Sequence, residues 1–144
     1  MFTKEERSGF KYWFAHWCAF QMTALNLKCW KFKYLFHDIE KPWLKLLIGD
    51  YSKVQSIHRK RNKHHIQYWI DKQFNVKKVD WEAMVIDWEC SRFTKLSAQL
   101  NARDTLEIEF EYLQKLKNDN VLINDDVINV FRENIENVLN KLNL

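Results

Sequence analysis

Histidines and aspartates that could bind metal ions lie between residues 16 and 87 of the chain. His37 and Asp38 are adjacent, and Lys41 follows three residues later, which gives the pattern HDxxK. An imidazole and a carboxylate together suit several divalent ions. A lysine beside such ions can hold a phosphate oxygen as a point charge. By itself an HD dipeptide more often combines a packed histidine with a capping aspartate, so a metal site requires further ligands.

A second group of histidines lies within a run of basic residues. If this segment is helical, His58, Asn62 and His65 follow at i, i+4 and i+7 and fall within roughly 40° of one another around the axis. His64 then lies roughly 100° off that line. The run Arg59–Lys63 could instead be a solvated face or a nucleic-acid patch. A basic patch does not require histidines at helical spacing, so this spacing favours a metal or phosphate site.

Further candidates come from two apolar stretches. His16 lies among tryptophans and phenylalanines, where a lone histidine is more often a core residue than a ligand. Asp87 lies in an apolar stretch, where a carboxylate is costly to bury unless it is paired or binds a metal. We expect Glu82 and Glu89, which flank Asp87, on outer faces of the same helix. The three cysteines are expected to be small core residues.

Composition predicts an all-α fold in a single domain. The 144 residues include only two glycines and one proline, which argues against sandwiches and barrels. Two glycines forty residues apart also exclude a glycine-rich phosphate loop. Residues 1–72 carry 14 Lys and Arg against 6 Asp and Glu, a net charge of +8, whereas residues 73–144 carry 9 against 13, a net charge of −4. An anionic partner would therefore be drawn to the first half.

Cysteine usage and the N-terminal sequence bear on location. Three cysteines without a CxxC pair favour free thiols in a reducing compartment. No signal peptide is visible, and the apolar stretch 10–27 contains polar residues that a membrane span would reject. We therefore expect a cytoplasmic protein without a membrane partner.

Helix signals predict six to seven helices in one compact domain. Thr3 with Glu6, Asp80 and Asn124 are expected to open helices, Gly49 to close one, and Asn62 to mark a disturbance. The expected helices span residues 3–24, 27–38, 43–48, 52–74, 80–96, 103–117 and 124–142. The step at Lys41–Pro42 should interrupt the second of them. Residues 1–98 would form the metal-site helices and residues 99–144 the helices that pack against them.

The order of these residues resembles the HD-domain superfamily of metal-dependent phosphohydrolases, whose pattern is H…HD…D on an all-helical core. His16, His37-Asp38 and Asp87 match that pattern, and the HDxxK form is similar to several phosphodiesterase branches. Further histidines after HD resemble those of branches that bind a second metal. Cyclic-di-GMP phosphodiesterases have a glycine-tyrosine-proline segment that is absent here after His65.

A closer resemblance is to a family of small bacterial and phage proteins with the motifs HDxSK, HxxxNxHHWxYW and MxxDW. The corresponding stretches are residues 37–41, 58–69 and 84–88, and the resemblance covers roughly residues 10–113. Glu40 stands in place of that family's serine, and Ile66 in place of a tryptophan. The segment between HDxxK and the second motif is short, which bears on the shape of the substrate pocket.

The resemblance implies an HD-like domain that hydrolyses a phosphoester with one or two divalent ions, which could be Mn, Fe, Zn, Co or Mg. The implied ligands of a first ion are His16, His37, Asp38 and Asp87. The implied ligands of a second ion are His58 and one of His64 and His65, with Asp38 able to bridge. The implied catalytic residues are Asp38, Lys41, Asn62 and His65. The implied substrate-binding residues are Lys41, Arg59, Arg61 and Tyr68, of which Tyr68 would stack on the base of a nucleotide.

Two other functions remain open from the sequence. The run Arg59–Lys63 could serve a nucleic-acid-binding or nuclease-like protein. The histidines could also hold a structural metal in a helical phage or bacterial interaction protein.

Overall fold

Seven α-helices and two short 3₁₀ helices form the regular structure of the described residues, which are 1–3, 6–71, 79–96, 100–118 and 123–144 of the computed structural model. The 3₁₀ helices are η1 (Glu6–Ser8) and η2 (Phe32–Phe36). The α-helices are α1 (Phe10–Asn26), α2 (Glu40–Ile48), α3 (Tyr51–Arg61), α4 (Ile66–Asp71), α5 (Trp81–Thr94), α6 (Ala102–Leu116) and α7 (Asp125–Leu142). No strand occurs among these residues, and Phe2 and Lys95 form an isolated β-bridge. The predicted all-α, single-domain fold class is confirmed.

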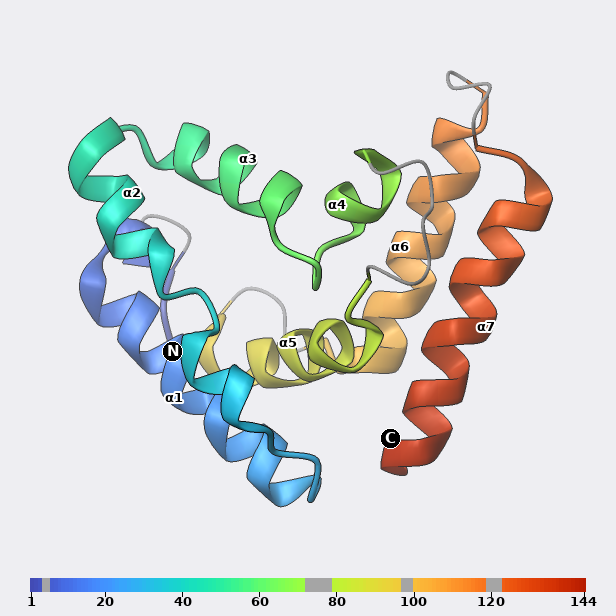
Figure 1. Ribbon diagram of the computed structural model, residues 1–144, viewed down its shortest axis with the longest axis horizontal. Coiled ribbons are helices and arrows are strands. Elements are labelled where there is room, and N and C mark those ends of the chain that lie inside the picture. The colour runs from blue at the N-terminus through green and yellow to red at the C-terminus, as the bar shows by residue number, and fades with distance from the viewer. Residues whose placement is uncertain (4–5, 72–78, 97–99, 119–122) are drawn as a thin grey trace.

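Helix α5 runs through the middle of the molecule, with α1 against one part of it and α6 and α7 against another (Figure 1). Every residue from Glu82 to Ser91 is buried, so α5 lacks the exposed polar face of a surface helix. The expectation that Glu82 and Glu89 lie on outer faces is wrong. Glu82 accepts hydrogen bonds from the Tyr34 hydroxyl and from Lys141 Nζ, and Glu89 accepts one from the backbone N–H of residue 102.

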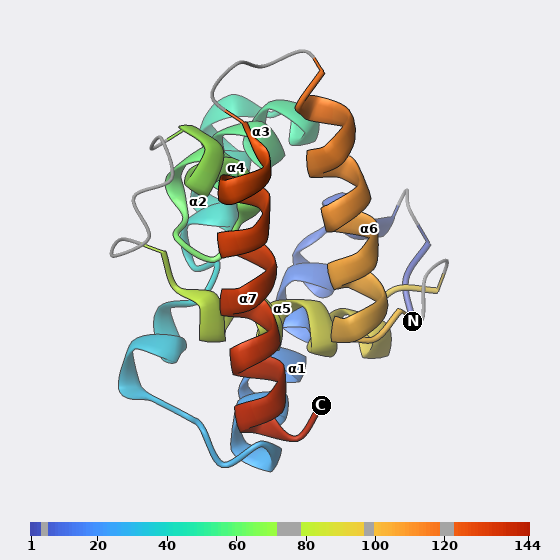
Figure 2. The same cartoon turned by 90° about the vertical axis from the view of Figure 1, so that its right-hand side faces the viewer.

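Helices α6 and α7 lie side by side and form the C-terminal part of the fold (Figure 2). Asn101 caps α6 in a reciprocal capping box with Asp104, and Asn124 caps α7 as predicted. Apolar residues at helical spacing on α7, among them Phe131, pack in the core with Trp69 of α4, whose ring centroid lies 5.4 Å from that of Phe131. These helices are therefore a packing layer, as the sequence indicates.

The helix expected over residues 27–38 is wrong. Only the 3₁₀ helix η2 forms there, and side chains of α1 bond to backbone carbonyls near its end. Trp17 Nε1 donates to the carbonyl of residue 35, and Gln21 Nε2 donates to that of Tyr34. The chain is interrupted at residues 37–39 rather than at Lys41–Pro42. Pro42 lies in the first turn of α2, as its position before the expected helix over 43–48 suggests, and its missing N–H leaves no helical bond unmade there. Gly49 ends α2 with φ of 73°, as expected.

The helix expected over residues 52–74 is split in two. Asp50 caps α3 through the N–H groups of Ser52 and Lys53, and α3 ends at Asn62, whose backbone is extended. A turn leads into α4, and residues 72–74 lie outside the described part of the chain. Thr3 and Glu6 exchange the predicted bonds, but they open η1 rather than α1. No helix among the described residues is both long and apolar enough to cross a membrane.

Candidate metal centre

All seven predicted ligands converge in the interior between α1, α3 and α5. His16 comes from α1, His58 from α3 and Asp87 from α5. The other four come from irregular backbone: His37 and Asp38 from the turn before α2, and His64 and His65 from the turn between α3 and α4. The ligand atoms form two groups, and within each group they lie within 4.8 Å of one another.

The first group consists of His16, His37 and Asp87, all of them buried. Asp87 Oδ1 lies 2.8 Å from His16 Nε2 and 3.4 Å from His37 Nε2. The ring of Phe20 stacks on His37 at a centroid distance of 3.7 Å, which fixes the plane of that imidazole. Thus α1 and α5 hold one histidine and one carboxylate rigidly, and Phe20 orients the third ligand.

The second group consists of Asp38, His58, His64 and His65. Asp38 Oδ1 lies 3.1 Å from His58 Nε2 and 3.2 Å from His64 Nε2. His65 Nε2 lies 2.7 Å from His58 Nε2. The predicted alignment of His58 and His65 is therefore present, but a break in the helix produces it rather than one continuous helical face.

Asp38 lies between the two groups. Its Oδ1 is 3.6 Å from His37 Nε2, and its Oδ2 is 3.9 Å from His16 Nε2 and forms an ion pair with Lys41 Nζ. The backbone of Asp38 is left-handed, with φ of 58°, and Trp13 Nε1 donates to its carbonyl at 2.8 Å. One carboxylate thus faces ligands of both groups, as expected for a residue that bridges two ions.

The spacing of these atoms fits a metal ion. Two ligands each about 2.0–2.2 Å from one ion are separated by about 2.9–3.5 Å, and the closest pairs in both groups approach this range. Asp38 Oδ1, His37 Nε2 and His64 Nε2 are buried, and none makes a well-aligned hydrogen bond to a described residue. Polar atoms buried in this way are costly unless something binds them. The two groups are therefore positioned to hold a metal ion.

The pKa shifts of both carboxylates and of two imidazoles also suit a cation. Burial would raise the pKa values of Asp38 and Asp87, but the neighbouring histidines, and Lys41 for Asp38, hold both well below the usual range. Burial lowers the pKa of His37 to about 4 and that of His65 well below its ordinary value. The carboxylates are thus ionised and these two imidazoles neutral near pH 7, which are the forms that bind metals.

Glu40 and Asn62 form hydrogen bonds with His58 of the second group. His58 Nδ1 donates to Glu40 Oε1, which also accepts a hydrogen bond of 2.6 Å from Asn62 Nδ2. Asn62 Nδ2 lies 3.0 Å from the backbone carbonyl of His58 as well. Because the bond to Glu40 occupies Nδ1, Nε2 is the atom of His58 that can bind a metal. Asn62, predicted to be catalytic, therefore contacts Glu40 and His58, and Glu40 is a supporting residue that the sequence did not single out.

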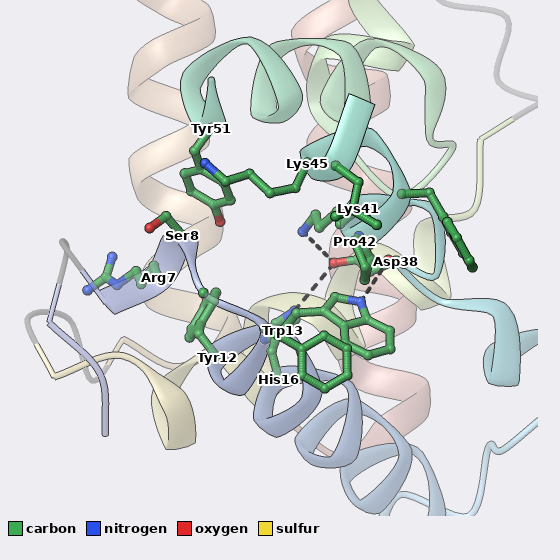
Figure 3. Close-up of a pocket in the computed structure, with 14 residues that line it drawn as sticks. Arg7, Ser8, Tyr12, Trp13, His16, Asp38, Lys41, Pro42, Lys45 and Tyr51 are labelled. Carbon is green, nitrogen blue, oxygen red and sulfur yellow. Dashed lines mark hydrogen bonds and ion pairs between the residues drawn. The ribbon is translucent and has the colours of Figure 1, made fainter. Parts of the chain in front are cut away.

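Among the described residues, four cavities adjoin the two groups. One of them, of about 240 Å³, reaches His65 and Asp87 and is also lined by Arg59 and Lys95. The other three differ in the character of their lining. The apolar cavity, of about 350 Å³, lies between α1, α2 and the start of α3 and reaches His16, Asp38 and Lys41 (Figure 3). The polar cavity, of about 290 Å³, reaches His16, His65 and Asp87. Its cationic lining residues are Arg7, Lys41, Arg59 and Lys95. A third cavity, of about 250 Å³, reaches His37, Asp38 and His64 and is lined by Lys33, Arg61 and Lys63.

The predicted substrate residues are distributed unevenly over these cavities. Lys41 lines the apolar and polar cavities, Arg59 the polar cavity and Arg61 the third cavity. The prediction for Tyr68 is not supported, because its side chain is buried and lines none of the four cavities. Arg7 and Lys95 were missed, since each comes from a segment without a motif and reaches the site only through the fold.

No protein-family model, no curated protein and no solved structure matches the chain.

Proposed function

We propose that this protein is a metal-dependent phosphohydrolase that acts on a nucleotide or another phosphoester. The observation that carries the proposal is the position of Asp38 between two groups of ligands, of which His16, His65 and Asp87 line a cavity together with four cations. In phosphoryl transfer, bound metal ions and cationic side chains together stabilise the negative charge on the phosphoryl oxygens. The resemblance to HD-domain phosphohydrolases points to the same chemistry.

His16, His37 and Asp87 would hold one ion, His58, His64 and His65 a second, and Asp38 would contact both. When bound, divalent ions supply an activated water molecule and polarise the phosphoryl oxygens. In the overall reaction the water oxygen bonds to phosphorus, the ester P–O bond breaks, and the leaving oxygen takes a proton.

The chain's own side chains bind and orient the phosphate. Lys41 Nζ is paired with Asp38 Oδ2, so its charge lies at the ligand groups, where negative charge develops on the phosphoryl oxygens. Asp38 also holds the pKa of Lys41 above its usual value, although burial opposes this, so the ammonium stays charged. His65 lines the polar cavity whereas His64 lines the third cavity. A phosphate in the polar cavity would therefore meet His65 first.

A phosphatase panel with defined metals tests this proposal. Chelator-treated protein is assayed on phosphomonoesters and phosphodiesters with added Mn, Fe, Co, Zn or Mg, and its metal content is measured. We expect hydrolysis only after metal addition, and a loss of at least about 100-fold in Asp87→Asn, because Asp87 is a ligand of the first group. Asp126→Asn, an exposed change of the same kind on α7, should retain full activity. Metal-independent hydrolysis, or full activity of Asp87→Asn, would refute the proposal.

Nucleic-acid binding is the second candidate, because Arg59, Lys60, Arg61 and Lys63 are all exposed at the end of α3. This function predicts oligonucleotide binding that weakens steeply with salt and does not require a metal. A structural metal in an interaction protein would instead give stoichiometric metal without hydrolysis. For location we propose the cytoplasm, since Cys18, Cys29 and Cys90 are free thiols, which suits a reducing compartment.

A further inference from the structure

The apolar cavity lies outside the ligand groups but adjoins them. Five aromatic residues contribute to its lining: Phe10, Tyr12, Trp13, Trp43 and Tyr51. Figure 3 shows it between α1 below and the α2–α3 segment above, with Asp38 and Lys41 at one side. Its surface is mostly carbon, as in sites that bind apolar groups.

The apolar and polar cavities share lining residues. Arg7, Tyr12, His16, Lys41 and Tyr51 line both, so the two cavities meet beside the metal ligands. A molecule that spans this junction would place an anionic head among the cations and an apolar body among the aromatic rings. A phosphate in the polar cavity would therefore lie next to the apolar cavity, whose lining disfavours water.

The rim of the apolar cavity is unusually apolar for a protein surface. Phe10 and Trp43 are each 66% exposed and Leu46 is 77% exposed, and all three line the cavity. Contiguous exposed apolar residues of this size mark a binding site more often than an ordinary surface. They would be covered by the apolar part of a bound molecule.

Four polar side chains that line this cavity already form bonds within the protein. Trp13 Nε1 bonds to the carbonyl of Asp38, Lys45 Nζ to that of Gly49, and Lys41 Nζ to the Asp38 carboxylate. The Tyr51 hydroxyl accepts a hydrogen bond from Gln55. A nucleobase has ring nitrogens and exocyclic groups that need partners, and it would compete for these four side chains with the bonds that they already make.

We infer that the substrate is a phosphate monoester whose organic group is apolar, with its phosphate in the polar cavity and its organic group between α1 and α2. This inference rests on the proposed phosphohydrolase function and narrows its substrate. The four cations of the polar cavity match the double charge of a monoester. The aromatic lining and the apolar rim match the organic group.

Direct binding of stable phosphonates tests the inference separately from catalysis. The metal-loaded protein is titrated with methylphosphonate, naphthylmethylphosphonate and adenosine monophosphate by calorimetry. The first two share one head group and differ only in the apolar body. We expect the naphthyl compound to bind at least about tenfold tighter than the methyl compound, equivalent to about 1.4 kcal/mol, and also tighter than the nucleotide.

Two variants on α2 form a matched pair. Leu46→Asn removes a lining residue and should reduce the tenfold preference for the naphthyl over the methyl compound to threefold or less, with unchanged affinity for methylphosphonate. Trp43→Ala, which changes another lining residue, should have the same effect. Leu47→Asn changes the next residue, which is 84% exposed and is not part of the cavity lining, and should leave the preference intact. Circular dichroism and metal content of each variant establish that it is folded and loaded.

Equal affinities for the two phosphonates, tighter binding of the nucleotide, or no binding of any probe would overturn the inference. A dimer that dissociates in Leu46→Asn, without any phosphonate preference, would also overturn it and assign the rim to a second copy of the chain. If the preference is present but no phosphoester is hydrolysed with any metal, the proposed function fails while the ligand preference stands. The two failures are therefore distinguishable.

Discussion

Replacement of Asp38 by asparagine is the sharpest test of the two-group arrangement. The side chain is 1% exposed, and its oxygens lie between 3.1 and 3.9 Å from imidazole nitrogens of four histidines. Asparagine keeps the size of the side chain but removes the negative charge and one acceptor oxygen. The variant therefore replaces the charged ligand that faces both groups with a weaker, neutral one while it preserves the packing.

The expected effect has two parts. Without metal, Lys41 loses its buried counter-charge, which lowers the free energy of unfolding by about 3–5 kcal/mol. With metal at 100 times the dissociation constant of the wild type, the wild-type protein gains about 2.7 kcal/mol. If loss of Asp38 raises that constant about 100-fold, the same metal concentration gives the variant only about 0.4 kcal/mol. The increase in the free energy of unfolding on adding metal, compared between wild type and variant, reports the ligand role of Asp38. The difference between the two proteins without metal reports the general loss of stability.

Urea unfolding of chelator-treated protein, with and without added metal, measures both parts. Asp126→Asn is the control, because it removes an exposed carboxylate remote from the ligands and should show the wild-type gain. Bound metal per chain is measured on the same samples. A full metal-dependent gain and full metal content in Asp38→Asn would refute the assignment of Asp38 as a ligand of either ion.

Two further predictions concern residues that support the site and the fold. Glu40→Ala should weaken metal binding by about 10- to 100-fold in a chelator competition without loss of helix content, because His58 loses the acceptor that orients it; unchanged affinity would contradict a positioning role. Glu82→Gln should lower the free energy of unfolding by about 2 kcal/mol at pH 7, because, against the effect of burial, Lys31, Tyr34 and Lys141 lower the pKa of Glu82 from 4.5 to about 2. A carboxyl group with a depressed pKa stabilises the fold above its unfolded pKa, so the difference between wild type and variant should shrink as the pH falls from 4.5 towards 2. A difference that persists unchanged to pH 2 in urea titrations would contradict this.

The sequence predicted the helices whose packing follows one apolar stripe. In α7, Phe131, Ile135 and Leu139 are buried at spacings of four, and the cap at Asn124 lies where the sequence placed it. The sequence did not predict the irregular backbone of residues 27–38, where donors on α1 bond to the carbonyls of Tyr34 and of residue 35. Such bonds join residues far apart in the chain and leave no local periodic signal.

Residue type identified the clustered histidines and aspartates better than helical geometry did. A face of His58, Asn62 and His65 was expected on one helix, yet α3 ends at Asn62 and the chain turns before His65. The cavities were not predictable, because their cations come from separate segments. Arg7 lies in η1 and Lys95 follows α5, and only the fold brings them to the polar cavity.

The irregular backbone explains how so many ligands reach one place. Neighbouring residues on a helix point about 100° apart, so a helical His37-Asp38 pair would not direct both side chains at one site as easily as a turn does. The left-handed conformation of Asp38 is uncommon outside glycine, asparagine and aspartate, and the bond from Trp13 to its carbonyl helps to hold it. Strained conformations of this kind persist where the surrounding structure enforces them, and they concentrate at functional sites. The proline that follows in α2 fixes the first turn of that helix, which keeps Lys41 beside the carboxylate. The same few residues thus shape both the ligand groups and the entrance of the apolar cavity.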